Sequence, residues 1–422
     1  MKFKSIAATA FLLLHCAMAH PLDFRGNISS EFSYFGRSSV GTDNFNFNSS
    51  VAAEVEVTHD LNDNIRLIAH PFARWDEHDD ERSRFVLREL LLSANFSNWE
   101  INAGVGTVFW GVTESRQLVD LINQTDAVEA TDNEDKLGQL MLNVKWFSDY
   151  GEFEAFLLPR FEERTFKGPN GRPFLGITVD RDLTTFESAQ GDQHLDVALR
   201  WTHSVDAWDI GLHYFDGTLR DPLLQVTQTD TGPVLAPRYL LVQQAGWDAQ
   251  GLYGDLAVKT ELIVQGGDEV DLHVETVSGI EYTWVGALSP MQEKEMLPDD
   301  WCTPDTRNPF KKLICNDRID LGLVLEYLWD ERGESSNQPF QNDLLAGVRL
   351  SFNDTATTDA LLGLVQDLDG GATTLSLEAS TRLFESFRLS VESTKFFNTG
   401  GDTSLQAFEN ESYIKADLSY FF

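Results

Sequence analysis

Apolar and polar residues alternate along segments of about ten residues, and this pattern recurs through most of the chain. In the first segment, Phe24, Ile28 and Phe32 occupy one set of alternate positions. Arg25 and Glu31 occupy the other set. Because successive side chains of a β-strand point to opposite faces, each segment predicts a strand with one apolar and one polar face. Repeated strands of this kind indicate an all-β protein.

The alternating segments add up to roughly 18 predicted strands, with a range of 16–18, and single-chain bacterial membrane barrels have an even number. The predicted strands cover residues 24–34, 47–57, 65–75, 85–94, 99–109, 140–146, 153–161, 195–203, 208–214, 239–249, 256–264, 272–284, 319–329, 344–352, 360–365, 373–383, 388–396 and 412–422.

The connections between these strands sort by length. A short set covers 59–64, 95–98, 148–151, 204–207, 250–254 and 384–387, and a long set covers 36–46, 112–138, 163–193, 217–237, 330–342 and 398–411. Short periplasmic turns and long extracellular loops are typical of outer-membrane barrels. We therefore expect an antiparallel transmembrane β-barrel of a Gram-negative outer membrane. Tryptophans near the strand ends fit interfacial girdles, namely Trp75, Trp99, Trp146, Trp201, Trp208, Trp284 and Trp329.

The connection over 288–317 breaks this rule, because it is long although it falls on the periplasmic side. Two explanations stay open. The segment is a small periplasmic or plug-like insertion, or a strand has been missed.

The first 19 residues have the composition of a secretory signal peptide. Lys2 and Lys4 precede an apolar run over 6–14, and the small residues Ala17 and Ala19 follow it. The run is too short to cross roughly 30 Å of hydrocarbon as a helix, which argues against a membrane anchor. We expect cleavage after Ala19, so that the barrel comprises residues 20–422.

The expected mature chain is strongly acidic. Loss of Lys2 and Lys4 leaves 30 Lys and Arg residues against 67 Asp and Glu residues, a formal charge of −37. Such a charge makes nucleic acid an improbable partner. Solubility in a salty medium explains the acidity more simply than a specific cationic ligand does.

Cys302 and Cys315 survive the expected cleavage, and we predict that they form a disulfide, because exported proteins fold in an oxidising compartment. By chain entropy alone, closing so short a loop contributes about 3 kcal/mol. Free-thiol labelling of the unreduced, denatured protein should find neither cysteine, whereas labelling of both would contradict the prediction.

Charged residues on the polar faces predict a wet or salt-bridged lumen. They cannot face lipid, where an Arg or Lys at the midplane costs about 2–4 kcal/mol. A network that only stiffens the wall explains them as well as a selectivity function does. The candidates are Arg66, Arg74, Arg160, Arg200, Arg349, Arg382, Glu281 and Glu326.

The segment 111–139 carries Glu114, Arg116, Asp120 and Asp126 around a partly apolar stretch over 118–122. Two interpretations stay open. The segment folds into the barrel as a constriction, or it is a solvated outer loop. The apolar stretch would be costly to leave in water. Two other loop segments, 76–81 and 166–174, are explained by solvation and by turn chemistry.

The last segment places Ile414, Leu418, Tyr420 and Phe422 on one face. A final amphipathic strand that ends in an aromatic residue resembles the signal by which outer-membrane barrels are passed to their assembly machinery. Tyr420 and Phe422 are therefore candidate assembly residues.

Four stretches, 109–126, 278–284, 320–332 and 342–354, resemble a large, mostly uncharacterised group of porin-like outer-membrane β-barrel proteins of Gram-negative bacteria. The likeness is scattered over most of the expected mature chain and is looser before Phe85. It implies a pore-forming barrel, but it carries no substrate and no catalytic residues. The connection over 288–317 is a departure from that group.

The sequence favours passive transport of a small solute through a lumen whose charged lining biases selection. A barrel with a filled lumen and binding loops is one alternative, and a channel for an apolar compound is another. We expect no enzyme, because no nucleophile and base stand in a recognisable motif. We also expect no cofactor and no metal. The expected partners are outer-membrane lipids, the barrel assembly machinery and a small solute.

Overall fold

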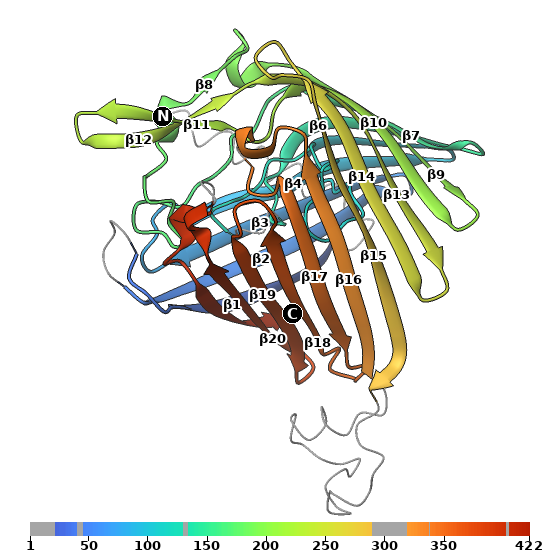
Figure 1. The fold of residues 1–422 in the computed structure, drawn as a ribbon. Coiled ribbons are helices and arrows are strands. Elements are labelled where there is room, and N and C mark those ends of the chain that lie inside the picture. The colour runs from blue at the N-terminus through green and yellow to red at the C-terminus, as the bar shows by residue number, and fades with distance from the viewer. Residues whose placement is uncertain (1–21, 40–44, 130–133, 289–318, 337, 402–404) are drawn as a thin grey trace, which may run out of the picture.

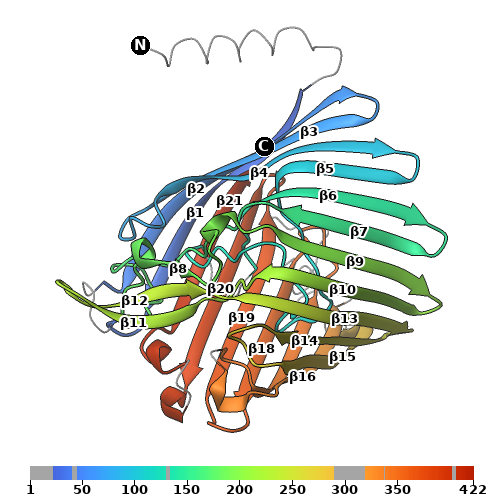
Figure 2. The ribbon, with the colours of Figure 1, turned by 90° about the horizontal axis from the view of Figure 1, so that it is seen from above.

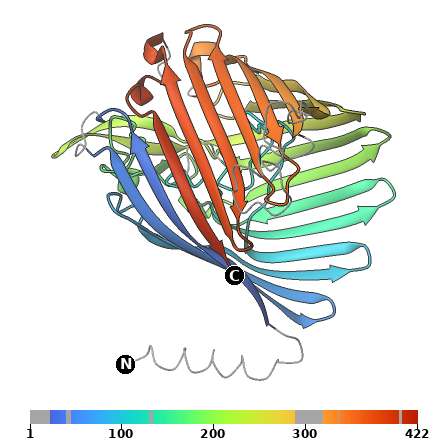
Figure 3. The same cartoon turned by 90° about the horizontal axis from the view of Figure 1, so that it is seen from below.

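The computed structural model describes residues 22–39, 45–129, 134–288, 319–336, 338–401 and 405–422. Eighteen strands form one antiparallel sheet that closes into a barrel (Figure 1). Each barrel strand pairs with the next along the chain, and β21 pairs with β1 to close the ring, as Figure 3 shows where the red strands lie beside the blue ones.

The barrel strands are β1 (Leu22–Phe35), β2 (Phe47–Asn62), β3 (Ile65–Asp76), β4 (Arg84–Phe96), β5 (Trp99–Gly106), β6 (Gln139–Ser148), β7 (Gly151–Leu158), β9 (Asp196–Val205), β10 (Trp208–Thr218), β13 (Leu241–Tyr253), β14 (Leu256–Gly266), β15 (His273–Leu288), β16 (Ile319–Asp330), β17 (Asn342–Ser351), β18 (Asp359–Asp367), β19 (Thr373–Leu383), β20 (Phe387–Phe397) and β21 (Tyr413–Phe421). Each of the 18 predicted segments overlaps one of these strands, so the fold class and the strand count are confirmed.

A second, small sheet was not predicted. It consists of β8 (Thr185–Phe186), β11 (Leu223–Thr229) and β12 (Gly232–Tyr239), which come from two of the long connections. Figures 1 and 2 show the β11–β12 hairpin extending beyond the barrel. Its strands escaped prediction because they lie in segments assigned to loops by their polar composition.

The outer face of the barrel is apolar. Large side chains such as Phe24, Phe32, Phe85 and Trp247 remain exposed there. In water such a continuous apolar surface would be unfavourable, whereas in a bilayer it is matched by lipid tails. Five of the seven tryptophans expected in interfacial girdles are exposed, namely Trp75, Trp99, Trp146, Trp284 and Trp329. The other two, Trp201 and Trp208, are partly exposed.

The two ends of the barrel differ in their connections. Hairpins such as those between β2 and β3 and between β4 and β5 have short turns, and we call this the short-turn end. The connections after β5, β7 and β10 lie at the opposite, long-loop end. Both Leu22 and Phe422 lie at the short-turn end, because β1 and β21 are antiparallel neighbours and Phe422 bonds to Gly26.

Several predictions concern residues outside the described ranges. The signal peptide over 1–19 is one, and the segment 288–317 with Cys302 and Cys315 lies outside them from residue 289 on. The cleavage and the disulfide therefore stay predictions. Among the helices of the described ranges, none is long and apolar enough to cross a membrane.

Candidate functional site: the lumen and its inward loop

The connection between β5 and β6 lies inside the barrel, where Figure 2 shows it within the ring of strands. We call the described residues of this connection, 107–129 and 134–138, the inner loop. Its residues Val119 and Ile122 are fully buried. They belong to a cluster that includes the inward-facing Phe156 and Ile263 of the barrel wall. Of the two interpretations that the sequence left open, the structure therefore places this segment inside the barrel.

Glu261 of β14 fastens the first turn of the inner loop to the wall. Its Oε1 accepts hydrogen bonds from the backbone nitrogens of Val112 (2.7 Å) and Thr113 (3.1 Å). Its Oε2 accepts from the nitrogens of Leu118 (2.7 Å) and Val119 (3.3 Å). A buried carboxylate needs such donors, because an unpaired buried charge is strongly unfavourable.

Glu326 of β16 holds the adjoining residues in the same way. The nitrogen of Glu114 donates to Oε1 (2.8 Å), and the nitrogen of Ser115 donates to Oε2 (2.8 Å). Arg116 then forms an ion pair with Glu275 of β15 (2.9 Å). We call Glu261 and Glu326 the wall clamp. They come from strands more than 140 residues along the chain from the loop residues they bind.

Gly111 lets the loop approach the clamp. Its φ is +130°, a conformation that L side chains rarely adopt, and an added Cβ would lie 3.0 Å from Glu261 Oε1 and 2.7 Å from Gln117. A glycine is therefore required at this close approach.

The far end of the inner loop is fastened by arginines of β3 and β4 and of the turn between them. Asp126 pairs with Arg84, and Glu129 Oε2 lies 2.8 Å from Arg74 Nε. Arg82 joins the same network through Glu31 of β1 (2.7 Å). These groups are largely buried, so the network stiffens the wall and holds the loop across the lumen.

Residues 163–176 extend from the end of β7 across the long-loop end. Thr165 Oγ1 donates to Asp126 (2.7 Å), and Lys167 Nζ donates to Val128 O (2.8 Å). Burial and the nearby Arg82 guanidinium lower the pKa of Lys167 to about 8. Arg172 Nε pairs with Glu411 just before β21 (2.9 Å), and both side chains are buried. The predicted turn is present, since Gly171 N donates to Gly168 O (2.9 Å). Turn chemistry does not explain the whole segment, because Lys167 and Arg172 also join the segment to other loops at the barrel mouth.

The predicted solvated loop over 76–81 is also wrong in part. Asp76 and Asp79 are buried, and Asp79 Oδ1 accepts a hydrogen bond from Gly168 N (3.1 Å). Asp76 accepts hydrogen bonds from backbone nitrogens of its own loop and pairs with Arg82 (3.0 Å), whereas Asp79 also receives a donor from the neighbouring loop. Composition alone does not distinguish such an acidic run from a solvated one.

The remaining predicted lumen residues fall into separate places. Arg349 and Glu281 meet Glu114 and Lys259 in one mixed cluster, where Arg349 lies 2.8 Å from Glu114. Arg200 pairs with Asp248 (2.9 Å).

Three other predicted arginines lie apart from that cluster. Arg66 pairs with Asp60 beside the β2–β3 turn. Arg382 is exposed on the inward face of β19, opposite Arg388 of β20. Arg160 is the exception to the predicted lumen wall, because β7 ends at Leu158 and Arg160 lies beyond it, exposed and paired with Asp192.

Asp120, the last of the charged residues predicted on the inner loop, is buried against Lys136 (3.1 Å) and accepts a hydrogen bond from Trp110 N (3.3 Å). It therefore joins two parts of the loop to each other and does not line a passage. Contacts within the loop itself therefore stabilise the part that lies between the wall clamp and the arginine network.

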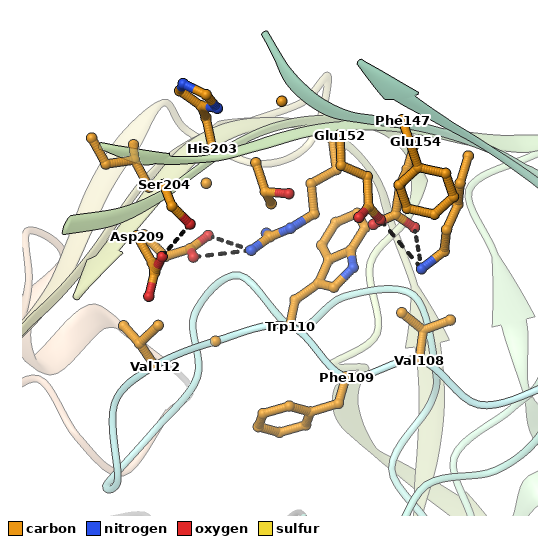
Figure 4. Close-up of a pocket in the computed structure, with 18 of the residues that line it drawn as sticks. Val108, Phe109, Trp110, Val112, Phe147, Glu152, Glu154, His203, Ser204 and Asp209 are labelled. Atoms are coloured by element: carbon orange, nitrogen blue, oxygen red, sulfur yellow. Dashed lines mark hydrogen bonds and ion pairs between the residues drawn. The ribbon is translucent and has the colours of Figure 1, made fainter. Parts of the chain in front are cut away.

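A cavity of about 710 Å³ opens between the start of the inner loop and strands β6, β7, β9, β10 and β13 (Figure 4). Lys145, Glu152, Glu154, Arg200, Asp209 and Asp248 supply its charged lining. Trp110 extends from the loop and carries the Arg200 guanidinium 4.7 Å above its ring. A second cavity of about 330 Å³ shares Val108 and Phe109 with the first. Space therefore remains on both sides of this part of the loop.

Comparison with known proteins supports the fold only. No protein-family description matches the chain, and no curated protein does. Among solved structures, Wzi of Escherichia coli, described as an outer-membrane protein involved in group 1 capsule assembly and a carbohydrate-binding β-barrel, matches with a TM-score of 0.51 at 10% identity, over 98% of this chain and 87% of Wzi. OmpT of Vibrio cholerae matches with a TM-score of 0.43 at 10% identity, over 95% and 99% of the two chains. A mutant porin of Rhodopseudomonas blastica matches with a TM-score of 0.41 at 12% identity, over 95% and 100%.

The chain is a closed transmembrane barrel like that of Wzi. At 10% identity the likeness shows a shared fold and does not indicate a ligand for this chain. The resemblance to porin-like proteins is not supported by the family comparison, because no protein-family description matches the chain.

Sequence analysis named Glu326 as a lumen candidate but did not predict that Glu326 and Glu261 bind the inner loop. Glu261 is one of many carboxylates on polar strand faces. Its partners are backbone nitrogens, which no particular type of side chain marks in the sequence. One feature of the sequence did indicate that part of the barrel wall is covered. Several positions in the water-facing set are apolar, including Phe156, Phe215 and Ile263, and their burial requires something to cover them.

Proposed function

We propose that this protein is a porin-like channel through which a small solute crosses an outer membrane passively. The observation that carries the proposal is the division of the lumen. The inner loop covers the apolar wall from β6 to β16, whereas charged residues on the inward faces of β19 and β20, such as Glu378, Arg382 and Arg388, remain exposed. Charged groups that stay exposed inside a barrel indicate a water-filled passage beside the loop.

The inner loop would narrow this passage without filling it. Its two sets of anchors, the wall clamp and the arginines of β3 and β4, hold it at a constant position. A rigid constriction selects by size and charge, because it cannot move aside for larger solutes. Single-channel conductance of the purified protein in planar bilayers tests the proposal, and absence of discrete conductance steps would contradict it.

We predict a preference for cations over anions. The expected mature charge of −37 should enrich cations at the mouth of the channel. The preference should weaken at high salt, since the screening length falls to about 3 Å at 1 M. Reversal potentials across a salt gradient measure it. Anion selectivity that persists in concentrated salt would show that inner arginines such as Arg382 and Arg388 determine the choice.

A second candidate is a surface-binding barrel with an occluded lumen. It is favoured by residues 163–176, which join opposite sides of the mouth through Arg172 and Glu411, and by the small sheet that extends beyond the barrel. Wzi, which has a similar fold, is itself described as a carbohydrate-binding barrel. A barrel of this kind would bind ligand without conducting ions, so the bilayer experiment separates the two candidates.

A further inference from the structure

The cavity between the inner loop and strands β6 to β13 has an excess of negative charge. Lys145 Nζ lies between two carboxylates, 3.5 Å from Glu152 and 3.4 Å from Glu154. Arg200 and Asp248 neutralise each other. Asp209 accepts a hydrogen bond from Ser204 Oγ (2.5 Å) and has no ion pair within the described ranges. The cavity lining therefore contains four carboxylates and two cations, namely Glu152, Glu154, Asp209 and Asp248 against Lys145 and Arg200.

This charge is spread along the wall and not gathered at a point. In the part of the chain that the structure describes, no three His, Cys, Asp or Glu side chains come together as they would around a metal ion. Figure 4 shows Asp209 and Glu154 on separate parts of the cavity wall. An extended cation would fit such a distribution better than a single metal ion.

The floor of the cavity has hydrogen-bonding capacity that the described residues leave unused. Asp248 is 4% exposed, and its carboxylate is paired with Arg200, whose Nη2 lies 2.9 Å from each of the two oxygens. Nη1 of Arg200, which is also buried, donates no hydrogen bond to any described residue. A buried donor is usually satisfied in a folded protein or by a ligand. A ligand with an oxygen acceptor would complement this nitrogen.

The cavity also offers an aromatic surface inside the barrel. Phe147 is 41% exposed although it belongs to the inward face of β6. The ring lies in the same lining as Lys145 and Glu152. An aromatic face attracts both organic cations and the C–H groups of a compact polyol.

We propose that this cavity binds a small, hydroxylated primary amine in its protonated form. The ammonium group would lie between the surplus carboxylates Glu152 and Asp209, which belong to separate parts of the cavity wall, and hydroxyl groups would reach the Arg200–Asp248 floor. This inference rests on the proposed channel function, because it identifies the class of solute that the channel would carry. Binding of the amine does not itself require conduction.

The probe is glucosamine, with glucose as the matched neutral compound. Both have the same ring size and nearly the same hydroxyl groups, so they differ mainly in the ammonium charge. Calorimetry on the folded, detergent-solubilised protein should show glucosamine binding about tenfold more tightly than glucose at low salt. Equal affinity for the two compounds, or binding of neither, would overturn the proposal.

Two variants locate the site. Glu152→Gln and Asp209→Asn should each weaken glucosamine binding about threefold, as expected for a partly solvated charge pair. Glu56→Gln is the control, because Glu56 of β2 pairs with Arg25 of β1 (2.8 Å) and neither residue lines this cavity. A loss of affinity in the control equal to that in the two variants would mean that overall charge, and not this cavity, binds the amine.

The same protein separates this inference from the channel function. Discrete conductance without glucosamine binding would refute the amine site and leave the channel. Glucosamine binding without any conductance would refute the channel and leave the amine site.

Discussion

Replacing both Glu261 and Glu326 with glutamine should release the inner loop from the barrel wall and raise the single-channel conductance. The two carboxylates accept hydrogen bonds from six backbone nitrogens of the loop. Each glutamine keeps one acceptor oxygen and presents an amide donor where the other oxygen was. The loop donors that faced that oxygen lose their acceptor, at about 1–3 kcal/mol for each buried group. The sum of several such losses should exceed what holds the loop in place.

The measurement is single-channel recording of the double variant beside the wild-type protein. Released loop residues should also produce noisier open states. Glu56→Gln is again the matched control, because its partner Arg25 belongs to β1 and not to the loop. An unchanged conductance and unchanged noise in the double variant would mean that the apolar cluster around Val119 and Ile122 is sufficient to hold the loop.

Deletion of Phe422 should sharply reduce the amount of folded barrel in the outer membrane. Phe422 N donates to Gly26 O (3.0 Å), and Gly26 N donates to Phe422 O (3.1 Å), so these two residues complete the seam between β21 and β1. The Phe422 ring lies over Gly26, where an added Cβ would be 3.0 Å from it. Backbone groups left unpaired at a seam in lipid cost several kcal/mol each. The residue is also a candidate part of the assembly signal.

Heat-modifiable mobility on gels measures the folded fraction. Asp230→Ala is a suitable control, because Asp230 is exposed at the tip of the β11–β12 hairpin. Phe422→Leu separates the two causes. It keeps the backbone bonds to Gly26 and removes only the aromatic ring, so a defect as large as that of the deletion would assign the effect to recognition of the ring. Normal levels of folded barrel in the deletion would contradict the prediction.

The sequence alone determined the barrel, because alternation is a local property. Whether Phe32 or Glu31 faces lipid depends only on the pleat of one strand, and a bilayer accepts only one of the two arrangements. The same local rule identified Trp75 and Trp284 as outward-facing residues. It failed at Arg160, because alternation does not determine where a strand ends.

The course of the inner loop was decided only by the tertiary structure. Its apolar residues Leu118 and Ile122 indicated that the loop is buried, but they did not indicate which surface it packs against. The wall clamp is formed by carboxylates far along the chain that bind backbone nitrogens, and every residue except proline has such a nitrogen. A contact whose donors are common to all residues leaves no pattern in one sequence. Only closure of the barrel brings Glu261 and Glu326 to the loop that they hold.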